Sequence, residues 1–397
     1  MEALSRVGRG YAQKFEASFS GSPNMVKVCH FISGDLWAGA EVMAFSLLKE
    51  LQEFSEIDVA AIVFNEGRLA LELRNADVPI FVVDEHSTSF YALVFQIRSL
   101  VQKLSPDVIH SHRYKENILA FLARGFRRKP RLIATQHGMP EGGSKRLLSK
   151  GRFVSGLNKF LLAKHFDSLV VVSDDMRQTY IQELGFNPQK VHTIHNGIEL
   201  PARAKHHNTE SGITVGSAGR FFPVKDYPLM VEIARTIKEK GYPVAFELAG
   251  DGPQRDIIGE RISSYGLDDA FLLKGHVEDM ADFYAGIDVF LNTSVHEGIP
   301  MSILEAMSYG LPVVAPKVGG IMEIITDEVD GFLIKDRNPM AFAEKIIFLE
   351  DNPEILNKMG RAAMVKVEEE YSAGAMAEKY LNLYFKAHLA GSPKKRK

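Results

Sequence analysis

The residues best suited to chemistry lie in the stretch Glu297–Glu305, which reads Glu-Gly-Ile-Pro-Met-Ser-Ile-Leu-Glu. It follows an apolar segment, 288–292, that is typical of a buried strand, and it opens a helix with Pro300 in the first turn. The free N–H groups and the dipole of a helix N-terminus favour anions, while carboxylates at Glu297 and Glu305 accept hydrogen bonds from hydroxyl groups. The stretch therefore predicts a site for a sugar, a diphosphate and a ribose in one row. A capped surface helix is the alternative for the stretch taken alone.

Two cations precede this stretch in the sequence. Arg220 ends a predicted strand after Gly219, and Lys225 follows five residues later. Arginine offers phosphate a planar fork of donors, and lysine offers a mobile point charge. Together they predict neutralisation of a departing diphosphate. A solvated arginine and a lysine beside a helix are the alternatives for each residue alone.

Strand and helix patterns alternate in two series, from residue 25 to 197 and from residue 213 to 334. Such alternation is typical of parallel sheets with helices on both faces, and the polar segment 201–212 separates the two series. We therefore predict an α/β protein with two doubly wound Rossmann-like domains in tandem. A cleft between them would be the default binding site. The expected boundaries are a loose segment 1–23, domains 24–205 and 206–370, and a C-terminal helix with a basic tail, 371–397, crossing back to the first domain.

The first domain begins with a strand at about 25–32, a loop and a helix from about Glu41 to Leu51. The small residues Gly39 and Ala40 in that loop would let a ligand approach the backbone, although a tight turn is the simpler interpretation. The loop lacks the Gly-x-Gly-x-x-Gly fingerprint of dinucleotide binding. A generic Rossmann oxidoreductase is therefore disfavoured.

Three histidines, His110, His112 and His137, fall at the ends of predicted strands. Residues two apart on a strand face the same way, so a zinc site is one interpretation. No His-Glu-x-x-His spacing supports it. We expect His110 and His112 to be packed or hydrogen-bonded, and we expect no bound metal.

Composition excludes several classes of protein. The formal net charge of −3 gives no overall attraction to nucleic acid. The single cysteine, Cys29, excludes an internal disulfide and a cysteine metal cluster. No apolar run approaches the roughly 20 residues of a membrane span, and the N-terminus does not resemble a secretory signal. These features predict a cytoplasmic protein.

The segment 145–164 is basic and has apolar residues at near-helical spacing. Its cations are Lys145, Arg146, Lys150, Arg152, Lys159 and Lys164. A basic amphipathic surface suits anionic lipid, so the segment predicts peripheral attachment to the inner face of the cell membrane and a lipid-linked acceptor. An ordinary helix packed on the sheet explains the pattern equally well.

The order of the motifs in the second half resembles the retaining glycosyltransferases of the GT-B fold, in particular family 4. The matching pieces are Gly-Arg220 with Lys225, Gly250-Asp-Gly-Pro, Gly275-His-Val, Glu297-Gly-Ile-Pro with Glu305, and Gly319-Gly-Ile-Met-Glu323. They cover most of residues 213–335. The first half matches more loosely, through Gly39-Ala-Glu41, His110-Ser-His112, Thr135-Gln-His137-Gly, Val171-Val-Ser173 and His195-Asn-Gly197. Ala40 departs from the glycine that many family members have there.

The resemblance implies roles for individual residues. Glu297 and His137 would contact the donor sugar, Glu305 the ribose, and Arg220 and Lys225 the diphosphate. Backbone around 275–277 would read the base. The donor-binding set would be Gly39, Arg220, Lys225, Val277, Glu297, Gly298, Ile299, Pro300, Met301, Ser302 and Glu305, and the catalytic set His137, Glu297, Arg220 and Lys225.

The implied activity is transfer of a hexose from a UDP- or GDP-linked donor to an acceptor hydroxyl, with retention of the anomeric configuration. The resemblance implies no metal and no further cofactor, because the cations and the helix terminus stabilise the leaving group. The acceptor, a glycan or a lipid-linked molecule of a surface polysaccharide, lipopolysaccharide or glycolipid, would lie on the first domain. The alternatives are a GT-B sugar-nucleotide epimerase or hydrolase and a non-catalytic nucleotide-sugar binding protein.

Overall fold

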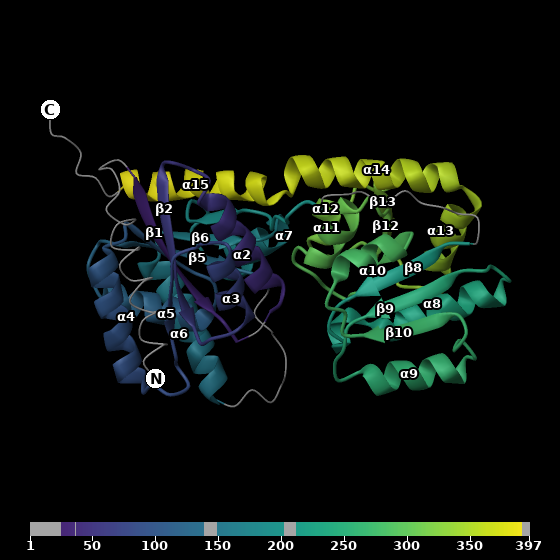
Figure 1. Cartoon of the computed structure of the whole chain (residues 1–397), viewed down its shortest axis with the longest axis horizontal. Coiled ribbons are helices and arrows are strands. Elements are labelled where there is room, and N and C mark those ends of the chain that lie inside the picture. The colour runs from purple at the N-terminus through teal and green to yellow at the C-terminus, as the bar shows by residue number, and fades with distance from the viewer. Residues whose placement is uncertain (1–24, 36, 139–148, 202–211, 391–397) are drawn as a thin grey trace. The chain divides into compact units, whose positions relative to one another are not determined.

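The structure is a computed structural model that describes residues 25–35, 37–138, 149–201 and 212–390, with the backbone alone for 149–154. The segment 1–23 and the basic tail after residue 390 lie outside the described residues. The chain divides into two compact units (Figure 1). Unit 1 comprises the described parts of 1–172, 177–195 and 373–397, and unit 2 comprises 173–176 and 196–372. The division thus falls at 195/196, ahead of the expected 205/206, because the bridge between Ile198 and Ser372 ties the connecting segment to unit 2.

Unit 1 contains a parallel sheet of seven strands in the order β3-β2-β1-β4-β5-β6-β7. The strands are β1 (Val26–Ser33), β2 (Ile57–Phe64), β3 (Ile80–Val83), β4 (Val108–Ser111), β5 (Arg131–Gln136), β6 (Ser168–Val171) and β7 (Val191–Thr193). Central strands of a parallel sheet are covered on both faces, and β1 and β2 are accordingly almost entirely buried. The strand order reverses between β1 and β4, which is the position where ligands bind in such sheets.

Two rows of helices flank this sheet (Figure 1). In one row α2 packs against α3 and α15, and in the other α5 packs between α4 and α6. The bounds are α2 (Gly39–Leu51), α3 (Arg68–Asn75), α4 (Phe90–Leu104), α5 (Tyr114–Arg124), α6 (Ser149–His165) and α15 (Ala373–Leu389). A short helix α7 (Asp174–Gln178) and a π-helical turn (Thr179–Glu183) follow β6.

The start of α2 corrects one expectation. Gly39 and Ala40 lie in the first turn of the helix rather than in the preceding loop. Ala38 has an extended backbone, and its carbonyl accepts a hydrogen bond of 3.0 Å from the Val42 amide, so the helical turn closes two residues before Glu41.

Unit 2 contains a second parallel sheet, of six strands in the order β10-β9-β8-β11-β12-β13, which reverses between β8 and β11. Its strands are β8 (Thr214–Ala218), β9 (Ala245–Ala249), β10 (Phe271–Gly275), β11 (Val289–Leu291), β12 (Val313–Pro316) and β13 (Gly331–Ile334). Its helices are a 3-10 turn (Pro223–Lys225), α8 (Tyr227–Glu239), α9 (Arg255–Ser264), α10 (Met280–Gly286), α11 (Met301–Ser308), α12 (Ile321–Ile324), α13 (Pro339–Asp351) and α14 (Pro353–Glu370).

Helix α8 shows how sequence places the core of unit 2. Its buried residues Met230, Ile233, Ala234 and Ile237 recur at helical spacing and therefore form one apolar stripe. The stripe packs in a core with the apolar faces of β8, β9 and α13. Two doubly wound parallel sheets are thus present, and the predicted fold class is confirmed.

Candidate active site

The predicted cations and carboxylate of unit 2 meet where its strand order reverses. Arg220 and Lys225 follow β8, and Glu297 follows β11, the neighbouring strand. The carboxyl ends of parallel strands share one edge of a sheet, and that edge carries ligands in doubly wound folds. The chain therefore brings residues separated by more than 70 positions to one edge.

Lys225 and Glu297 form a close ion pair. The Lys225 Nζ donates to Glu297 Oε1 at 2.5 Å, and the Ser294 hydroxyl donates to the same oxygen at 2.6 Å. The side chains are 23% and 15% exposed, so the pair is partly shielded from water. Glu297 Oε2 has no partner among the described residues and is available to a hydroxyl group.

The loops that carry this pair are joined by further hydrogen bonds. The Val295 amide donates to the Val224 carbonyl at 2.8 Å, and the Thr293 hydroxyl donates to the Lys225 carbonyl at 2.8 Å. These contacts fix the Lys225 turn against the loop after β11.

Arg337 also bridges the two loops, and sequence reasoning missed it. Its guanidinium donates to the Asp226 carboxylate at 2.5 Å and to the carbonyls of Thr293 and Ser294 at 2.8 and 2.6 Å. A lone arginine after β13 carries no motif, so only the folded chain shows this role.

Arg220 differs from Lys225 because it has no carboxylate partner among the described residues. Its side chain is exposed and its guanidinium lies 5.1 Å from the centroid of the Phe222 ring. Stacking on an aromatic face leaves the edge of the guanidinium free to donate. Of the two predicted cations, Lys225 is therefore neutralised and Arg220 is available.

The segment between Glu297 and α11 presents unpaired amides. The N–H groups of Gly298, Ile299, Met301 and Ser302 donate to no group among the described residues. Helix α11 begins at Met301, and Pro300 precedes it with φ −73° and ψ 117°. The expectation that Pro300 lies in the first turn is therefore wrong by one residue; its carbonyl instead accepts the Ile303 amide at 3.1 Å.

Two glycines allow another part of the backbone to pack closely against this segment. A Cβ at Gly319 would lie 2.2 Å from the Glu297 carbonyl oxygen, and one at Gly320 would lie 1.9 Å from the Gly298 carbonyl oxygen. The Gly320 amide donates to the Glu297 carbonyl at 3.0 Å. Only glycine permits this approach. The Gly319-Gly320 pair therefore packs against the backbone of Glu297 and Gly298 and helps to fix the segment with the unpaired amides.

Glu305 is held inside α11 by Tyr284. The Tyr284 hydroxyl donates to Glu305 Oε2 at 2.6 Å. Burial raises the pKa of the Glu305 carboxyl, and the hydrogen bond from Tyr284 opposes that effect. Oε1 has no partner among the described residues. Val277 follows β10, two strands from β8 on the same sheet, and is half-buried.

Unit 1 has a second ion pair at its own strand-order reversal. Glu41, in the first turns of α2, is 1% exposed, and its Oε1 accepts a hydrogen bond of 2.5 Å from Arg113, which follows β4. Burial raises the pKa of Glu41 and Arg113 lowers it. Gly39 lies in the same first turn as Glu41.

The histidines of unit 1 are hydrogen-bonded, as expected for His110 and His112. His110 Nδ1 and Nε2 contact the hydroxyls of Tyr384 and Thr135 at 2.7 and 2.8 Å, and His112 Nδ1 lies 3.3 Å from His137 Nε2. Burial lowers the pKa of His137 to about 3, and Arg113 contributes to the shift.

The set of three close imidazoles contains His30 rather than His137, which the disfavoured zinc interpretation grouped with His110 and His112. His30, His110 and His112 have ring nitrogens within 4.8 Å of one another. Sequence reasoning missed His30 because it lies mid-strand in β1; it is adjacent to His110 only because β1 and β4 pair in register.

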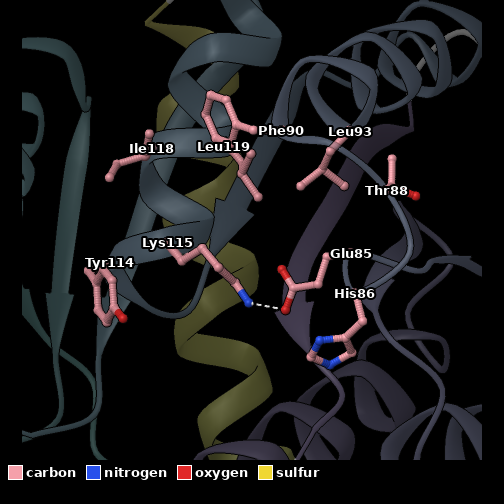
Figure 2. A pocket seen from close by; sticks show the side chains of 9 residues that line it. All are labelled: Glu85, His86, Thr88, Phe90, Leu93, Tyr114, Lys115, Ile118 and Leu119. Atoms are coloured by element: carbon pink, nitrogen blue, oxygen red, sulfur yellow. Dashed lines mark hydrogen bonds and ion pairs between the residues drawn. The ribbon is translucent and has the colours of Figure 1, made fainter.

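A pocket of about 320 Å³ opens between α4 and α5 (Figure 2). Its lining combines an ion pair of 2.6 Å between Lys115 and Glu85 with apolar side chains from both helices. The lining residues are Glu85, His86, Thr88, Phe90, Leu93, Tyr114, Lys115, Ile118 and Leu119.

The helix α6 covers most of the basic segment 145–164. Residues 145–148 and the side chains of 149–154 lie outside the described set. Leu161 is buried, whereas Lys159, Phe160 and Lys164 are exposed. No described helix is both long and apolar enough to cross a membrane.

Two family models match consecutive parts of the chain. Residues 37–201 match the model described as Glycosyltransferase Family 4, and residues 201–365 match the model described as Glycosyl transferases group 1. Together they include the predicted site residues of both units, from Gly39 to Glu305.

Named relatives and solved structures agree with these models. A poly(ribitol-phosphate) alpha-N-acetylglucosaminyltransferase from Staphylococcus aureus is 29% identical over 56% of this chain and 44% of its own length, so the match spans under half of that relative. A UDP-Gal:alpha-D-GlcNAc-diphosphoundecaprenol alpha-1,3-galactosyltransferase from Escherichia coli is 28% identical over 73% of this chain and 78% of its own length. Anabaena Alr3699/HepE, solved with UDP, has a TM-score of 0.78 at 18% identity and covers 91% of this chain and 100% of its own, which shows the shared fold.

Two family models that span residues 37–365, two doubly wound sheets and GT-B structural neighbours lead to one conclusion: this chain belongs to the GT-B glycosyltransferases.

Proposed function

We propose that the chain transfers a sugar from a nucleoside diphosphate donor to an acceptor hydroxyl with retention of the anomeric configuration. The observation that carries the proposal is the edge of unit 2, where an available Arg220, the Lys225–Glu297 pair and unpaired amides of 298–302 converge. The phosphates would accept from the cations and amides, while the oxygens of Glu297 and Glu305 would accept from sugar and ribose hydroxyls. UDP bound to the structural neighbour HepE and the UDP-linked donor named for the Escherichia coli relative support a uridine donor.

In this proposal the protein contributes preorganised charge. When the glycosidic bond breaks, negative charge develops on the diphosphate, and donors already fixed in place stabilise it without reorganisation. Lys225 is fixed by Glu297, and the amides are fixed by Gly319 and Gly320. Such a site needs no metal, so we expect activity to survive chelation of divalent cations.

Retention follows if the acceptor hydroxyl attacks the face that the diphosphate leaves, through an oxocarbenium-like state. Glu297 Oε1 already accepts from Lys225 and Ser294, which favours a hydroxyl-binding role over attack on the sugar carbon. Both relatives are named as enzymes that form an alpha linkage. The NMR coupling constant of the product's anomeric proton tests this step, and an inverted linkage would contradict it.

A GT-B epimerase or hydrolase is the rival within the fold. It would use the same donor site but release free sugar or nucleotide without an acceptor. Incubating the enzyme with UDP-sugars and GDP-sugars, with and without a glycan or lipid-linked acceptor, separates the two. Transfer product supports our proposal, and release of free sugar at the same rate in both arms supports the rival.

We further propose that the pocket of Figure 2 receives part of the acceptor. It lies where β3 and β4 lead into α4 and α5, and its polar side offers Glu85 and Lys115 to hydroxyl groups. Its apolar side is formed by Phe90 and Leu93 of α4 with Ile118 and Leu119 of α5, and the exposed ring of Tyr91 contacts Phe90. This combination suits an amphipathic, lipid-linked acceptor such as the one named for the Escherichia coli relative.

Peripheral attachment to an anionic membrane is the finer proposal for localisation. Exposed Phe126 and Phe160 contact His165 and lie close in sequence to the exposed cations Arg127, Arg128 and Lys159. Flotation with vesicles of phosphatidylglycerol and phosphatidylcholine tests it. Binding that is lost at high salt supports attachment, and no binding to anionic vesicles would contradict it.

A further inference from the structure

Asp226 has an uncommon backbone conformation beside the paired cation of unit 2. It follows Lys225 directly and has φ 48° and ψ 48°, in the left-handed region. Residues with a side chain enter that region at a cost in energy, and such strain persists only where the surrounding structure imposes it. Contacts outside the turn must therefore hold Lys225 and Asp226 in place.

The carboxylate of Asp226 does not cap the helix that begins after it. An aspartate at the N-cap of a helix generally accepts a hydrogen bond from an amide of the first turn. Asp226 is the N-cap of α8, but its side chain makes no capping hydrogen bond, and only its carbonyl accepts, from the Leu229 amide at 3.0 Å. The carboxylate oxygen Oδ2 is directed towards Arg337 instead.

Arg337 connects three acceptors of the candidate site. Its Nη2 donates to Asp226 Oδ2 at 2.5 Å and to the Thr293 carbonyl at 2.8 Å, and its Nη1 donates to the Ser294 carbonyl at 2.6 Å. A guanidinium presents donors from two terminal nitrogens in one plane, which the single ammonium of a lysine does not. Because the acceptors lie on the segments that follow β8 and β11, one side chain fixes both segments.

The fold brings Arg337 to this position. It lies between β13 and α13, where the Asn338 side chain caps α13 by accepting from the Met340 amide at 3.0 Å. Helices α8 and α13 pack against each other. Each follows a parallel strand of the same sheet, so both begin at the same edge. Arg337, at the start of α13, therefore reaches Asp226 at the start of α8.

The acceptors of this guanidinium adjoin the residues that the proposed function uses. Asp226 follows Lys225 in the chain. The Ser294 hydroxyl donates to Glu297 Oε1 at 2.6 Å, and the same oxygen accepts from Lys225. A shift of either segment would therefore change the geometry of the Lys225–Glu297 pair.

Charge gives Arg337 a second effect at this edge. Arg220, Lys225 and Arg337 are cations, whereas Asp226 and Glu297 are carboxylates. Cations outnumber carboxylates in this set only while Arg337 is present. Without it, Asp226 would lose its ion-pair partner next to the proposed position of the diphosphate, and repulsion between the two would weaken donor binding.

We propose that Arg337 is a positioning residue of the donor site. It holds the turn at Asp226 against the segment 293–294. The two segments then present Lys225 and Glu297 to the donor in one fixed geometry. The consequence for sugar transfer rests on the proposed function. The positioning itself does not, because it depends on hydrogen bonds within unit 2 alone.

Hydrogen exchange without substrate tests the positioning by itself. The Val295 amide donates to the Val224 carbonyl at 2.8 Å and so reports whether the two segments stay together. We expect Arg337→Gln to speed exchange at Val295 about tenfold. The Phe246 amide, which donates to the Ala270 carbonyl at 2.8 Å in the sheet, should be unaffected. Unchanged exchange at Val295, or an equal increase at both amides, would overturn the proposal.

Donor kinetics test the consequence for transfer. Arg337→Lys keeps the charge and loses the planar fork, whereas Arg337→Gln loses both. We expect turnover at saturating donor to fall about tenfold in both variants, because the Lys225–Glu297 geometry is disturbed in both. The KM for the donor should rise in Arg337→Gln alone, where Asp226 has lost its cation. Full turnover in Arg337→Lys would overturn the positioning role.

Arg261→Gln is the matched control in the same unit. Arg261 donates to Glu232 at 2.8 Å between α9 and α8, and its side chain is 35% exposed, close to the 28% of Arg337. The control should change neither the exchange at Val295 nor the donor kinetics. A loss of turnover in Arg261→Gln equal to that in Arg337→Gln would overturn the proposal.

The two measurements separate the positioning role from the proposed function. Faster exchange at Val295 in Arg337→Gln, together with a wild-type protein that transfers sugar from no UDP- or GDP-sugar, would contradict the proposed function and support the positioning. If Arg337→Gln fails to fold, the exchange at Val295 in Arg337→Lys decides, since we expect it to rise there as well.

Discussion

The sheets of the two units reverse their strand order in the same way, but the side chains near the two reversals differ in charge. The edge of unit 2 carries an available arginine, a lysine–carboxylate pair and unpaired amides, all suited to an anion. Next to the edge of unit 1, four imidazoles are kept neutral by burial and joined by hydrogen bonds. Charged side chains therefore gather at the edge of unit 2, whereas the imidazoles of unit 1 are uncharged and interact through hydrogen bonds.

The largest expected effect is a difference in acid stability between the two units. The pKa values of His30 and His137 are lowered from 6.5 to about 3 in the folded chain. Below pH 6.5 these histidines bind protons in the unfolded chain but remain neutral in the folded chain. The free energy of unfolding therefore falls as the pH falls towards 3. Each such histidine removes on the order of 1 kcal/mol per pH unit in this window.

The single tryptophan, Trp37, packs on Phe45 in unit 1 and reports this transition by fluorescence. Hydrogen exchange read by mass spectrometry follows both units at once. We expect unit 1 to open at a higher pH than unit 2, because the described imidazoles with lowered pKa values lie in unit 1. Simultaneous opening of both units below pH 4 would contradict the expectation that unit 1 is less stable to acid than unit 2.

The second prediction removes the paired cation of unit 2. Lys225→Gln leaves Glu297 without its ion-pair partner and the leaving diphosphate without a preorganised charge. We expect kcat/KM for the donor to fall by about 10²–10³. Lys238→Gln, which breaks an exposed ion pair with Asp269 in the same unit, is the control and should leave kcat/KM unchanged. Equal activity of both variants would remove Lys225 from the site.

At these two edges, some of the site residues could be predicted from the sequence and others could not. Lys225, Glu297 and the 298–302 amides were predictable because they belong to motifs with fixed local spacing. His30 and Arg337 were not, since their roles depend on the pairing of β1 with β4 and on a bridge across more than 100 residues. The starts of α2 and α11 were misplaced by one or two residues, because Ala38 and Pro300 act as N-caps without the usual capping side chain.

The third prediction tests the support behind the amides. Gly320→Ala places a Cβ 1.9 Å from the Gly298 carbonyl oxygen, so the loop must shift. We expect a loss of roughly 1–3 kcal/mol of stability and a higher KM for the donor. Gly286→Ala, where a Cβ meets nothing within 4 Å, is the control for thermal unfolding and donor kinetics. A Gly320→Ala enzyme with unchanged KM would show that the loop tolerates the shift.

The fourth prediction separates charge from shape at Arg220. Arg220→Lys keeps the cation but loses the planar fork stacked on Phe222. We expect donor affinity to fall about fivefold in Arg220→Lys and further in Arg220→Gln, with a weaker salt dependence only in the glutamine variant. Titration calorimetry with UDP and with GDP at two salt concentrations measures both quantities. Identical affinities for the three proteins would exclude phosphate contact by Arg220.

The central claim is that the edge of unit 2, beside Lys225 and Glu297, binds the nucleoside diphosphate. Hydrogen exchange of the amides in 294–305, measured with and without UDP or GDP, tests it most directly. We predict that one of the two nucleotides slows exchange at Gly298, Ile299, Met301 and Ser302. Slowed exchange elsewhere in the chain, with these four amides unchanged at a saturating nucleotide concentration, would contradict the account.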